Sequence, residues 1–253
     1  PLRDVYKRQV IDYHRNLDIT EATTTTSYTQ DGTTFKRETF SSYPDDVTVT
    51  HLTKKGNKTL DFTLWNSLTE DLLANGNYSW EYSNYKNGHV TTDANGILLK
   101  GTVKDNGLQF ASYLGIKTDG TVTVQNETLT VTGASYATLY LSAKTNFAQN
   151  PKTNYRKDID LEKTVKGIVE AAKAKDYETL KKAHIKDYQS LFNRVKLNLG
   201  GNKTAQTTKE ALQGYNPEKG QKLEELFFQY GRYLLISSSR DRTDALPVSY
   251  THL

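Results

Sequence analysis

Two-residue turn pairs, separated by segments in which apolar and polar residues alternate, dominate the first 145 residues of the chain. Such pairs suit tight hairpins, because both central residues of the turn need positive φ. They are Asp31-Gly32, Asn87-Gly88, Asn95-Gly96 and Asp119-Gly120. Short strands with turns at this spacing predict a mainly β fold, an antiparallel sandwich over residues 10–148.

The alternation places apolar residues on one face of each predicted strand and polar residues on the other, so we expect each sheet to have one solvated face. The apolar positions are Val47 and Val49; Leu60, Phe62 and Leu64; Leu108, Phe110, Leu114 and Ile116; Val122 and Val124; Leu129 and Val131; and Leu139 and Leu141.

The apolar period changes near Asn150-Pro151, which predicts a helical connector over residues 149–221. Leu161, Val165, Ile168, Val169 and Ala172 keep helical spacing. Asp176 is a candidate N-cap for a second helix that contains Tyr177, Leu180, His184, Tyr188 and Leu191. The stretch "RVKLNLGG", residues 194–201, alternates as a short strand and is followed by a polar, threonine-rich loop.

The segment "KLEELFFQYGRYLLISSSR", residues 222–240, predicts one further helix that is apolar on too many sides for a surface element. Its spacing places Leu223, Leu226, Phe227, Tyr230 and Leu234 on a core-facing stripe. Phe228, Leu235 and Ile236 lie off that stripe. We therefore expect an exposed apolar patch around these three residues unless further chain covers it.

Composition excludes several classes of function. The 253 residues carry a net charge of +4 and contain no cysteine, so disulfides, thiol catalysis and cysteine-ligated metals are excluded. We find no basic cluster interleaved with aromatic residues and no apolar run of membrane-spanning length, and we expect neither a nucleic acid nor a membrane as partner. Extracellular and cytoplasmic bacterial locations both stay open.

Methionine is absent even at position 1, so we expect the sequence to be a piece of a longer reading frame. Residues 1–9 and 241–253 fit neither flanking pattern and resemble translated adaptor sequence, so we treat them as non-native tails.

The histidines are His14, His51, His89, His184 and His252, and none has the spacing of a metal or catalytic motif. His51 shares the face of Val47 and Val49, and His184 lies on the buried stripe of its helix, so both are predicted to be interior side chains. His14 has Tyr13, Arg15 and Asp18 as neighbours, and we favour a structural network there over substrate contact.

The adjacent carboxylates Asp45-Asp46 and Glu70-Asp71 are weak candidates for glycoside hydrolysis, which needs two carboxyl groups facing each other across a bond. Asp45-Asp46 follows Pro44 and is typical of a solvated turn. Trp65 and Trp80 could stack on a sugar, although packing is the commoner role. The sequons at Asn57, Asn77, Asn126 and Asn202 matter only in a glycosylating host. From its residues alone the chain shows no active site, no metal site and no cofactor motif.

Four blocks of sequence, taken together, resemble glycoside hydrolase family 95, the α-L-fucosidase family. They are "YHRNLDITEA" (13–22), "FKRETFSSYPDDVTVTHLT" (35–53), "DYQSLFNRVKLNLG" (187–200) and "LFFQYGRYLLISSSR" (226–240). Their order and spacing make the similarity specific, and it runs from about Ile11 to Arg240.

The resemblance implies a β-supersandwich joined by helices to an (α/α)₆ barrel, of which residues 222–240 would form the first helix. In this family an inverting reaction takes place in the barrel. A glutamic acid protonates the leaving oxygen, and a water held by asparagines and an aspartate attacks C1 of fucose. These residues all lie in segments beyond Arg240, so none is assigned to a position here and the substrate-binding residues stay unassigned. The resemblance implies no cofactor, a fucosylated glycan as substrate and the absent barrel as the intramolecular partner.

Three functional hypotheses remain open at this point. The chain could be an inactive fragment of an inverting α-L-fucosidase, or a carbohydrate-binding sandwich without hydrolytic activity. The second reading would be favoured by exposed coplanar aromatics among Tyr78, Trp80, Tyr82 and Tyr85. A third reading makes the sandwich a structural brace for the barrel, and we regard this as its main role within a fucosidase.

Overall fold

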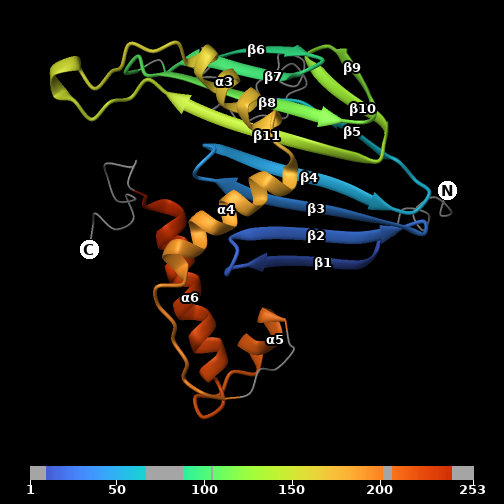
Figure 1. Ribbon diagram of the computed structural model, residues 1–253, viewed down its shortest axis with the longest axis vertical. Coiled ribbons are helices and arrows are strands. Elements are labelled where there is room, and N and C mark those ends of the chain that lie inside the picture. The colour runs from blue at the N-terminus through green and yellow to red at the C-terminus, as the bar shows by residue number, and fades with distance from the viewer. Residues whose placement is uncertain (1–9, 67–87, 104, 202–206, 241–253) are drawn as a thin grey trace. The chain divides into compact units, whose positions relative to one another are not determined.

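The computed structural model describes residues 10–66, 88–103, 105–201 and 207–240. The chain divides into two compact units, the first formed by residues 1–16 and 23–184 and the second by residues 17–22 and 185–253. Each unit is described by itself. The described strands lie almost entirely in the first unit. Figure 1 labels these strands and the helices.

The strands are β1 (Ile11–Asp18), β2 (Thr23–Gln30), β3 (Thr33–Ser42), β4 (Val47–Lys55), β5 (Leu60–Leu64), β6 (Gly88–Asp93), β7 (Gly96–Thr102), β8 (Gln109–Thr118), β9 (Thr121–Gln125), β10 (Thr128–Ala134) and β11 (Tyr136–Thr145). They form an eight-stranded sheet in the order β1-β2-β3-β4-β11-β8-β7-β6 and a three-stranded sheet in the order β5-β10-β9. The pairings from β2 to β6 in the large sheet and both pairings of the small sheet are antiparallel. The predicted mainly β, antiparallel sandwich is confirmed.

The turn pairs have different outcomes. Asp31-Gly32 closes the β2–β3 hairpin with φ of 47° and 74°, as predicted. The β6–β7 turn lies one residue earlier than expected, because Asp93 pairs with Gly96 and leaves Ala94 and Asn95 as the loop. The sequence pattern missed the β9–β10 hairpin, whose loop residues Asn126 and Glu127 have φ of 48° and 58°. Asn87-Gly88 lies partly outside the described residues.

Asp119-Gly120 does not close a hairpin, because β8 belongs to the large sheet and β9 to the small one. Asp119 instead accepts hydrogen bonds from the backbone N–H groups of Ser135 (2.9 Å) and Tyr136 (3.1 Å). A Cβ on Gly120 would lie 2.7 Å from the Cβ of Ala134. The pair therefore marks the place where the chain passes from one sheet to the other, and the glycine permits close packing there.

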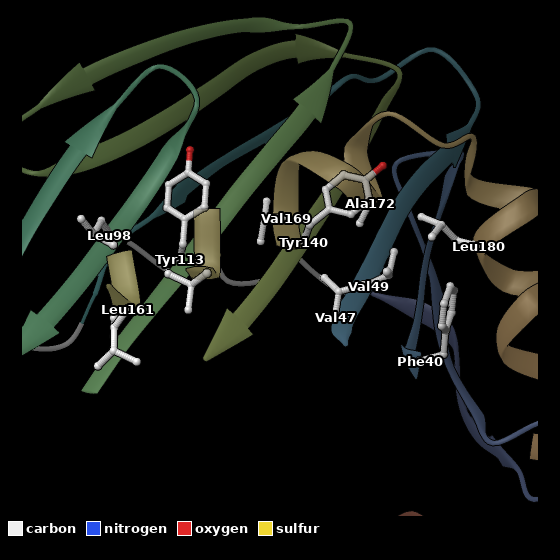
Figure 2. Close-up of a cluster of buried hydrophobic side chains, with 12 residues drawn as sticks. Phe40, Val47, Val49, Leu98, Tyr113, Tyr140, Leu161, Val169, Ala172 and Leu180 are labelled. Atoms are coloured by element: carbon white, nitrogen blue, oxygen red, sulfur yellow. The ribbon is translucent and has the colours of Figure 1, made fainter. Parts of the chain in front are cut away.

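The large sheet has a core on each face. One core lies against the small sheet and contains Leu60, Val90, Ile97, Ile116, Leu129, Val131 and Ala134. The other lies beneath helix α3 (Leu161–Lys173) and the beginning of α4 (Tyr177–Phe192). Figure 2 shows this second core, with Phe40, Val47, Val49, Leu98, Tyr113 and Tyr140 from the strands and Leu161, Val169, Ala172 and Leu180 from the helices.

Helix α3 is anchored at both ends and in its middle. Its N-cap Asp160 accepts a 2.9 Å hydrogen bond from the backbone of Lys163. Glu162 pairs with Lys100 of β7 at 2.8 Å, and beyond the other end Lys175 pairs with Asp45 at 2.5 Å. At the centre, Gly115 of β8 leaves room for Val169, whose Cγ1 would lie 2.5 Å from a Cβ at that position. The helix thus lies directly on the backbone of the central strands.

The second unit contains the end of α4, the short helix α5 (Thr208–Gln213) and helix α6 (Gln221–Ser238). A short 3₁₀ turn, η2 (Pro151–Thr153), belongs to the first unit.

The predicted α4 N-cap is confirmed, since Asp176 accepts a 2.8 Å hydrogen bond from the backbone of Thr179. Helix α5 was not predicted, although Thr207 and Glu210 form a reciprocal capping box that the sequence pattern shows.

The predicted strand at residues 194–201 is wrong, because these residues are irregular. Within the second unit this segment is held by side chains of α6 instead of a partner strand. Arg232 donates a 3.1 Å hydrogen bond to the carbonyl of Val195, and the backbone N–H of Leu199 donates one of 2.5 Å to Glu225. Alternation alone does not make a strand where no neighbouring strand supplies backbone partners.

We expect Gly115→Ala to destabilise the fold by about 1–3 kcal/mol, because the added methyl group would displace α3 from the sheet. The free energy of unfolding from urea titration would measure this. Gly167→Ala, at an exposed position of α3 where nothing lies within 4 Å of a Cβ, is the matched control. It should stabilise the protein by up to about 1 kcal/mol. Equal stability of the Gly115 variant and the wild type would contradict the described packing.

Candidate functional site

The described part of the first unit contains a cluster of buried polar side chains centred on Glu38 of β3. The side chain of Glu38 is only 10% exposed and pairs with Lys36 and with Lys181 of α4, both at 2.8 Å. Tyr177, the first residue of α4, donates a hydrogen bond to the same carboxylate. The cluster therefore ties the beginning of α4 to the face of the large sheet.

These contacts decide the protonation of Glu38. Burial alone would raise the pKa of this carboxyl group, but the hydrogen bonds from Lys181, Lys36 and Tyr177 outweigh it and hold the pKa at about 2. Burial and the same carboxylate raise the pKa of the Tyr177 hydroxyl far above its ordinary value. At neutral pH the cluster thus contains an ionised glutamate and a neutral tyrosine.

His184 is an interior side chain, as predicted, whereas His51 is only half-buried. The His51 ring stacks on Tyr177 with centroids 4.0 Å apart, and its Nδ1 lies 2.8 Å from the Thr138 hydroxyl. Burial lowers the pKa of the His51 imidazole, although the charge of Glu38 partly opposes this. His184 is 4% exposed and stacks on Phe40. Both rings act as packing between the sheet and the helices.

This cluster lacks the features of a hydrolytic site. A carboxyl group with a pKa near 2 cannot serve as the general acid, which needs a raised pKa. Both oxygens of Glu38 are already occupied by cations of the same chain. Within the described residues, no group of three or more acidic or histidine side chains is arranged to hold a metal ion. The cluster is a structural anchor.

The other candidates are dispersed. Asp45-Asp46 forms a turn, as expected, but Asp45 is not solvated: its side chain is 6% exposed and it binds Lys175 and Ser42. His14 and His89 are exposed on β1 and β6. Asp18 accepts hydrogen bonds from Thr20 and Glu21, so it caps a turn instead of joining a network around His14.

Several remaining sequence candidates can be placed only in part. Trp65 is 53% exposed just after β5, so the packing role expected for it is not what the structure shows. The sequon asparagines Asn57 and Asn126 lie at exposed positions. The candidates outside the described residues are Glu70, Asp71, Asn77, Tyr78, Trp80, Tyr82, Tyr85, Asn202 and His252.

The second unit presents a different feature. Helix α6 has apolar side chains that the described residues of this unit leave exposed. One side of α6 contacts α4: the Arg232 guanidinium lies over the Phe192 ring, 5.0 Å from its centroid, and Tyr233 meets Tyr188 edge-on. Tyr188 also donates a 2.7 Å hydrogen bond to the carbonyl of Ile19. Arg240 pairs with both oxygens of Asp187 at 2.7 and 2.9 Å.

The exposed residues of α6 correct the predicted orientation. Phe228 and Leu235 are exposed, as predicted. Four of the five residues expected to face the core are exposed as well, with Phe227 at 78%, and only Leu223 is half-buried. Ile236, expected in the exposed patch, is half-buried. No residue of α6 is fully buried. We call the exposed set the α6 face; it comprises Leu226, Phe227, Phe228, Tyr230, Leu234 and Leu235. A face of this kind marks a surface for packing against further chain or a partner.

Comparison with known families accounts for both units. Residues 5–150 match the family described as glycosyl hydrolase family 65, N-terminal domain. The chain belongs to this family. Residues 176–250, which include α4, α5 and α6, match the family 95 catalytic domain. A family 65 N-terminal domain followed by the start of a family 95 catalytic domain is an N-terminal region like that of the family 95 α-L-fucosidases, so the predicted resemblance is confirmed.

Similar curated proteins include two with fucosidase names. Alpha-L-fucosidase 2 of Arabidopsis thaliana is 30% identical over 261 residues, covering 91% of this chain and 29% of that protein. Probable alpha-fucosidase A of Aspergillus niger is 31% identical over 243 residues, covering 90% of this chain and 28% of that protein. The chain thus spans less than a third of the length of these relatives.

A solved structure confirms the fold of the chain. The protein described as "Putative kojibiose phosphorylase from human microbiome" superposes with a TM-score of 0.51 at 12% identity, covering 74% of this chain and 26% of that protein. At this identity the likeness concerns the fold alone.

No helix among the described residues is long and apolar enough to cross a bilayer.

We expect Glu38→Gln to lower the free energy of unfolding at pH 7 by about 2–3 kcal/mol, because Lys181 and the half-exposed Lys36 lose the largely buried carboxylate that they share. The folded-state pKa lies below the ordinary 4.5, so this stabilisation is complete above pH 4.5 and is lost as the pH falls toward 2. Denaturant titrations of both proteins between pH 2 and pH 7 should therefore converge at the acid end.

Glu170→Gln is the control for this measurement, because Glu170 is 56% exposed in its pair with Lys173. It should change stability by less than about 1 kcal/mol at any pH. A difference between Glu38→Gln and the wild type that does not vary with pH would show that the charge of Glu38 is not what stabilises the cluster.

Proposed function

We propose that the chain is the non-catalytic N-terminal part of an inverting α-L-fucosidase-like glycoside hydrolase that removes terminal L-fucose from glycans. It would comprise the sandwich at residues 10–148, a helical connector at 149–221 and the first helix of an (α/α)₆ barrel at 222–240. The observation that carries this proposal is the α6 face: six large apolar side chains of one helix are exposed in a segment that matches a catalytic-domain family.

The chemistry of the described carboxylates supports an inactive fragment. Inversion needs a carboxylic acid and a second carboxylate about 6.5–9.5 Å apart, with a water between them. Glu38 and Asp45 are well shielded, but each is held by lysine in an ion pair that fixes a helix to the sheet. These residues stabilise the scaffold, and the reacting groups would be supplied by barrel segments after Arg240. The fucosylated glycan would bind there, and the barrel would be the partner of the α6 face.

The sandwich would then serve to brace the barrel. Its helix-facing core fixes α3 and the start of α4, and α4 continues into the second unit, where its last turns contact α6.

We expect the chain by itself to release no fucose from 2′-fucosyllactose or from an aryl α-L-fucoside, measured by a coupled fucose assay. The parent protein, expressed from the gene recovered with its flanking DNA, should release fucose with inversion, which NMR of the first-formed anomer would show. Fucose release by the chain alone, at a rate that scales with its concentration, would defeat the proposal.

We expect the α6 face to cause self-association of the isolated chain, visible as a concentration-dependent mass in size-exclusion chromatography with light scattering. Phe227→Glu should shift the equilibrium toward monomer, because it places a charge at the centre of the face. Val124→Glu, at a 42% exposed position of β9, adds the same charge elsewhere and should leave association unchanged. A compact monomer with slow hydrogen exchange across residues 226–237 would contradict an unpartnered helix.

A further inference from the structure

The segment between β11 and α3 is a rigid projection from the large sheet. Its two arms are joined by hydrogen bonds from the backbone of Ala148 to the carbonyl of Tyr155 (3.1 Å) and from Lys157 to Asn146 (2.7 Å). Arg156 donates a 2.7 Å hydrogen bond to the carbonyl of Asn106, which ties the projection to the loop before β8. In Figure 1 it is the yellow segment that extends beyond the strands before α3.

Two aromatic rings are presented on this projection. Phe147 and Tyr155 lie on opposite arms with ring planes only 3° apart and centroids separated by 6.3 Å. They are 49% and 45% exposed, so the pair contributes little to any core. The parallel rings form an apolar platform held in one orientation.

The backbone at Tyr155 is strained in a way that maintains this platform. Asn154 and Tyr155 are consecutive residues with φ of 51° and 57°. Asparagine tolerates the left-handed region, but a bulky aromatic residue rarely adopts it, and the conformation costs about 1–2 kcal/mol. Strain of this kind persists where it positions a functional side chain. Here it places an exposed ring parallel to Phe147.

A hollow of about 460 Å³ lies beside the platform. Its apolar walls include the Phe147 and Phe110 rings, and its polar groups come from Ser112, Thr145 and Lys157. Lys144 also lines it, but this amine is paired with Asp46 at 2.5 Å. The volume suits a ligand of one or two sugar rings.

We propose that this hollow and the Phe147–Tyr155 platform form a carbohydrate-binding site, separate from any barrel active site. The apolar face of a pyranose would stack on the exposed ring of Phe147, and its hydroxyl groups would bond to Ser112, Thr145 and the Lys157 amine. A neutral ligand fits better than an anion, because one of the two lysines is already neutralised by Asp46. The site does not require the chain to be part of a fucosidase.

The test is saturation-transfer NMR on the whole chain with lactose, L-fucose and 2′-fucosyllactose as probes. We expect transfer from protein to at least one of these sugars, with an affinity in the millimolar range. Phe147→Ala should weaken binding about fivefold to tenfold, the effect of one aromatic stacking contact. Tyr155→Asn should weaken binding by a smaller factor, because Tyr155 does not line the hollow and acts only through its stack with the Phe147 ring. Tyr155→Asn removes the ring but suits the left-handed backbone, so it keeps the fold even if Phe147→Ala does not.

Trp65→Ala is the matched control, since Trp65 is also about half exposed but does not line the hollow. It should leave binding unchanged. Absence of transfer to all three sugars overturns the proposal, and so does binding that Trp65→Ala reduces while Tyr155→Asn does not. Because the measurement reports binding and not hydrolysis, its failure would leave the proposed fucosidase function untouched.

Discussion

The packing of α3 on the central strands of the large sheet is the interaction on which the rest of the structure depends. The apolar side chains of β4, β7, β8 and β11 on this face are buried beneath α3 and the beginning of α4, and Phe40 of β3 is covered by α4. An open sheet with such a face could not remain exposed to water, since each buried aliphatic side chain is worth about 1.5–3 kcal/mol. Helix α3 can pack this close to the sheet because Gly115 has no side chain that would clash with Val169.

Ion pairs then fix where the helices begin and end. Apolar packing is non-directional and would tolerate a helix that slides along the sheet, whereas the pairs Lys100–Glu162 and Lys175–Asp45 connect particular points. Glu38 does the same for the first turns of α4. An ionised carboxylate is costly to desolvate, so it keeps its place only while its partners keep theirs. The polar cluster that resembles a candidate site is thus explained by the architecture.

Sequence patterns predicted the elements whose signals are local. Periodicity predicted the shared face of Val47 and Val49 and the helices α3 and α4. Capping chemistry predicted the N-cap Asp176. The failures concern partners that the local sequence does not specify. Asp119-Gly120 has the composition of a hairpin turn but joins two sheets, and residues 194–201 alternate without a neighbouring strand. The Glu38 cluster joins residues far apart along the chain, so no motif marks it. Phe147 and Tyr155 are close in sequence, but their contact depends on two consecutive residues with positive φ, which no local pattern predicts.

For helix α6 the sequence predicted the element correctly but not the side that its neighbour covers. Its spacing correctly predicted a helix with more apolar surface than one neighbour could cover, but it assigned the wrong stripe to the covered side. The side that contacts α4 is occupied by Arg232 and Tyr233. The Arg232 guanidinium lies over the Phe192 ring and donates a hydrogen bond to the carbonyl of Val195, and the Tyr233 ring meets Tyr188 edge-on. A hydrophobic pattern predicts the side that the complete fold buries most deeply. In this chain the most apolar side of α6 is exposed, so the contact with α4 does not account for the apolar pattern of this helix.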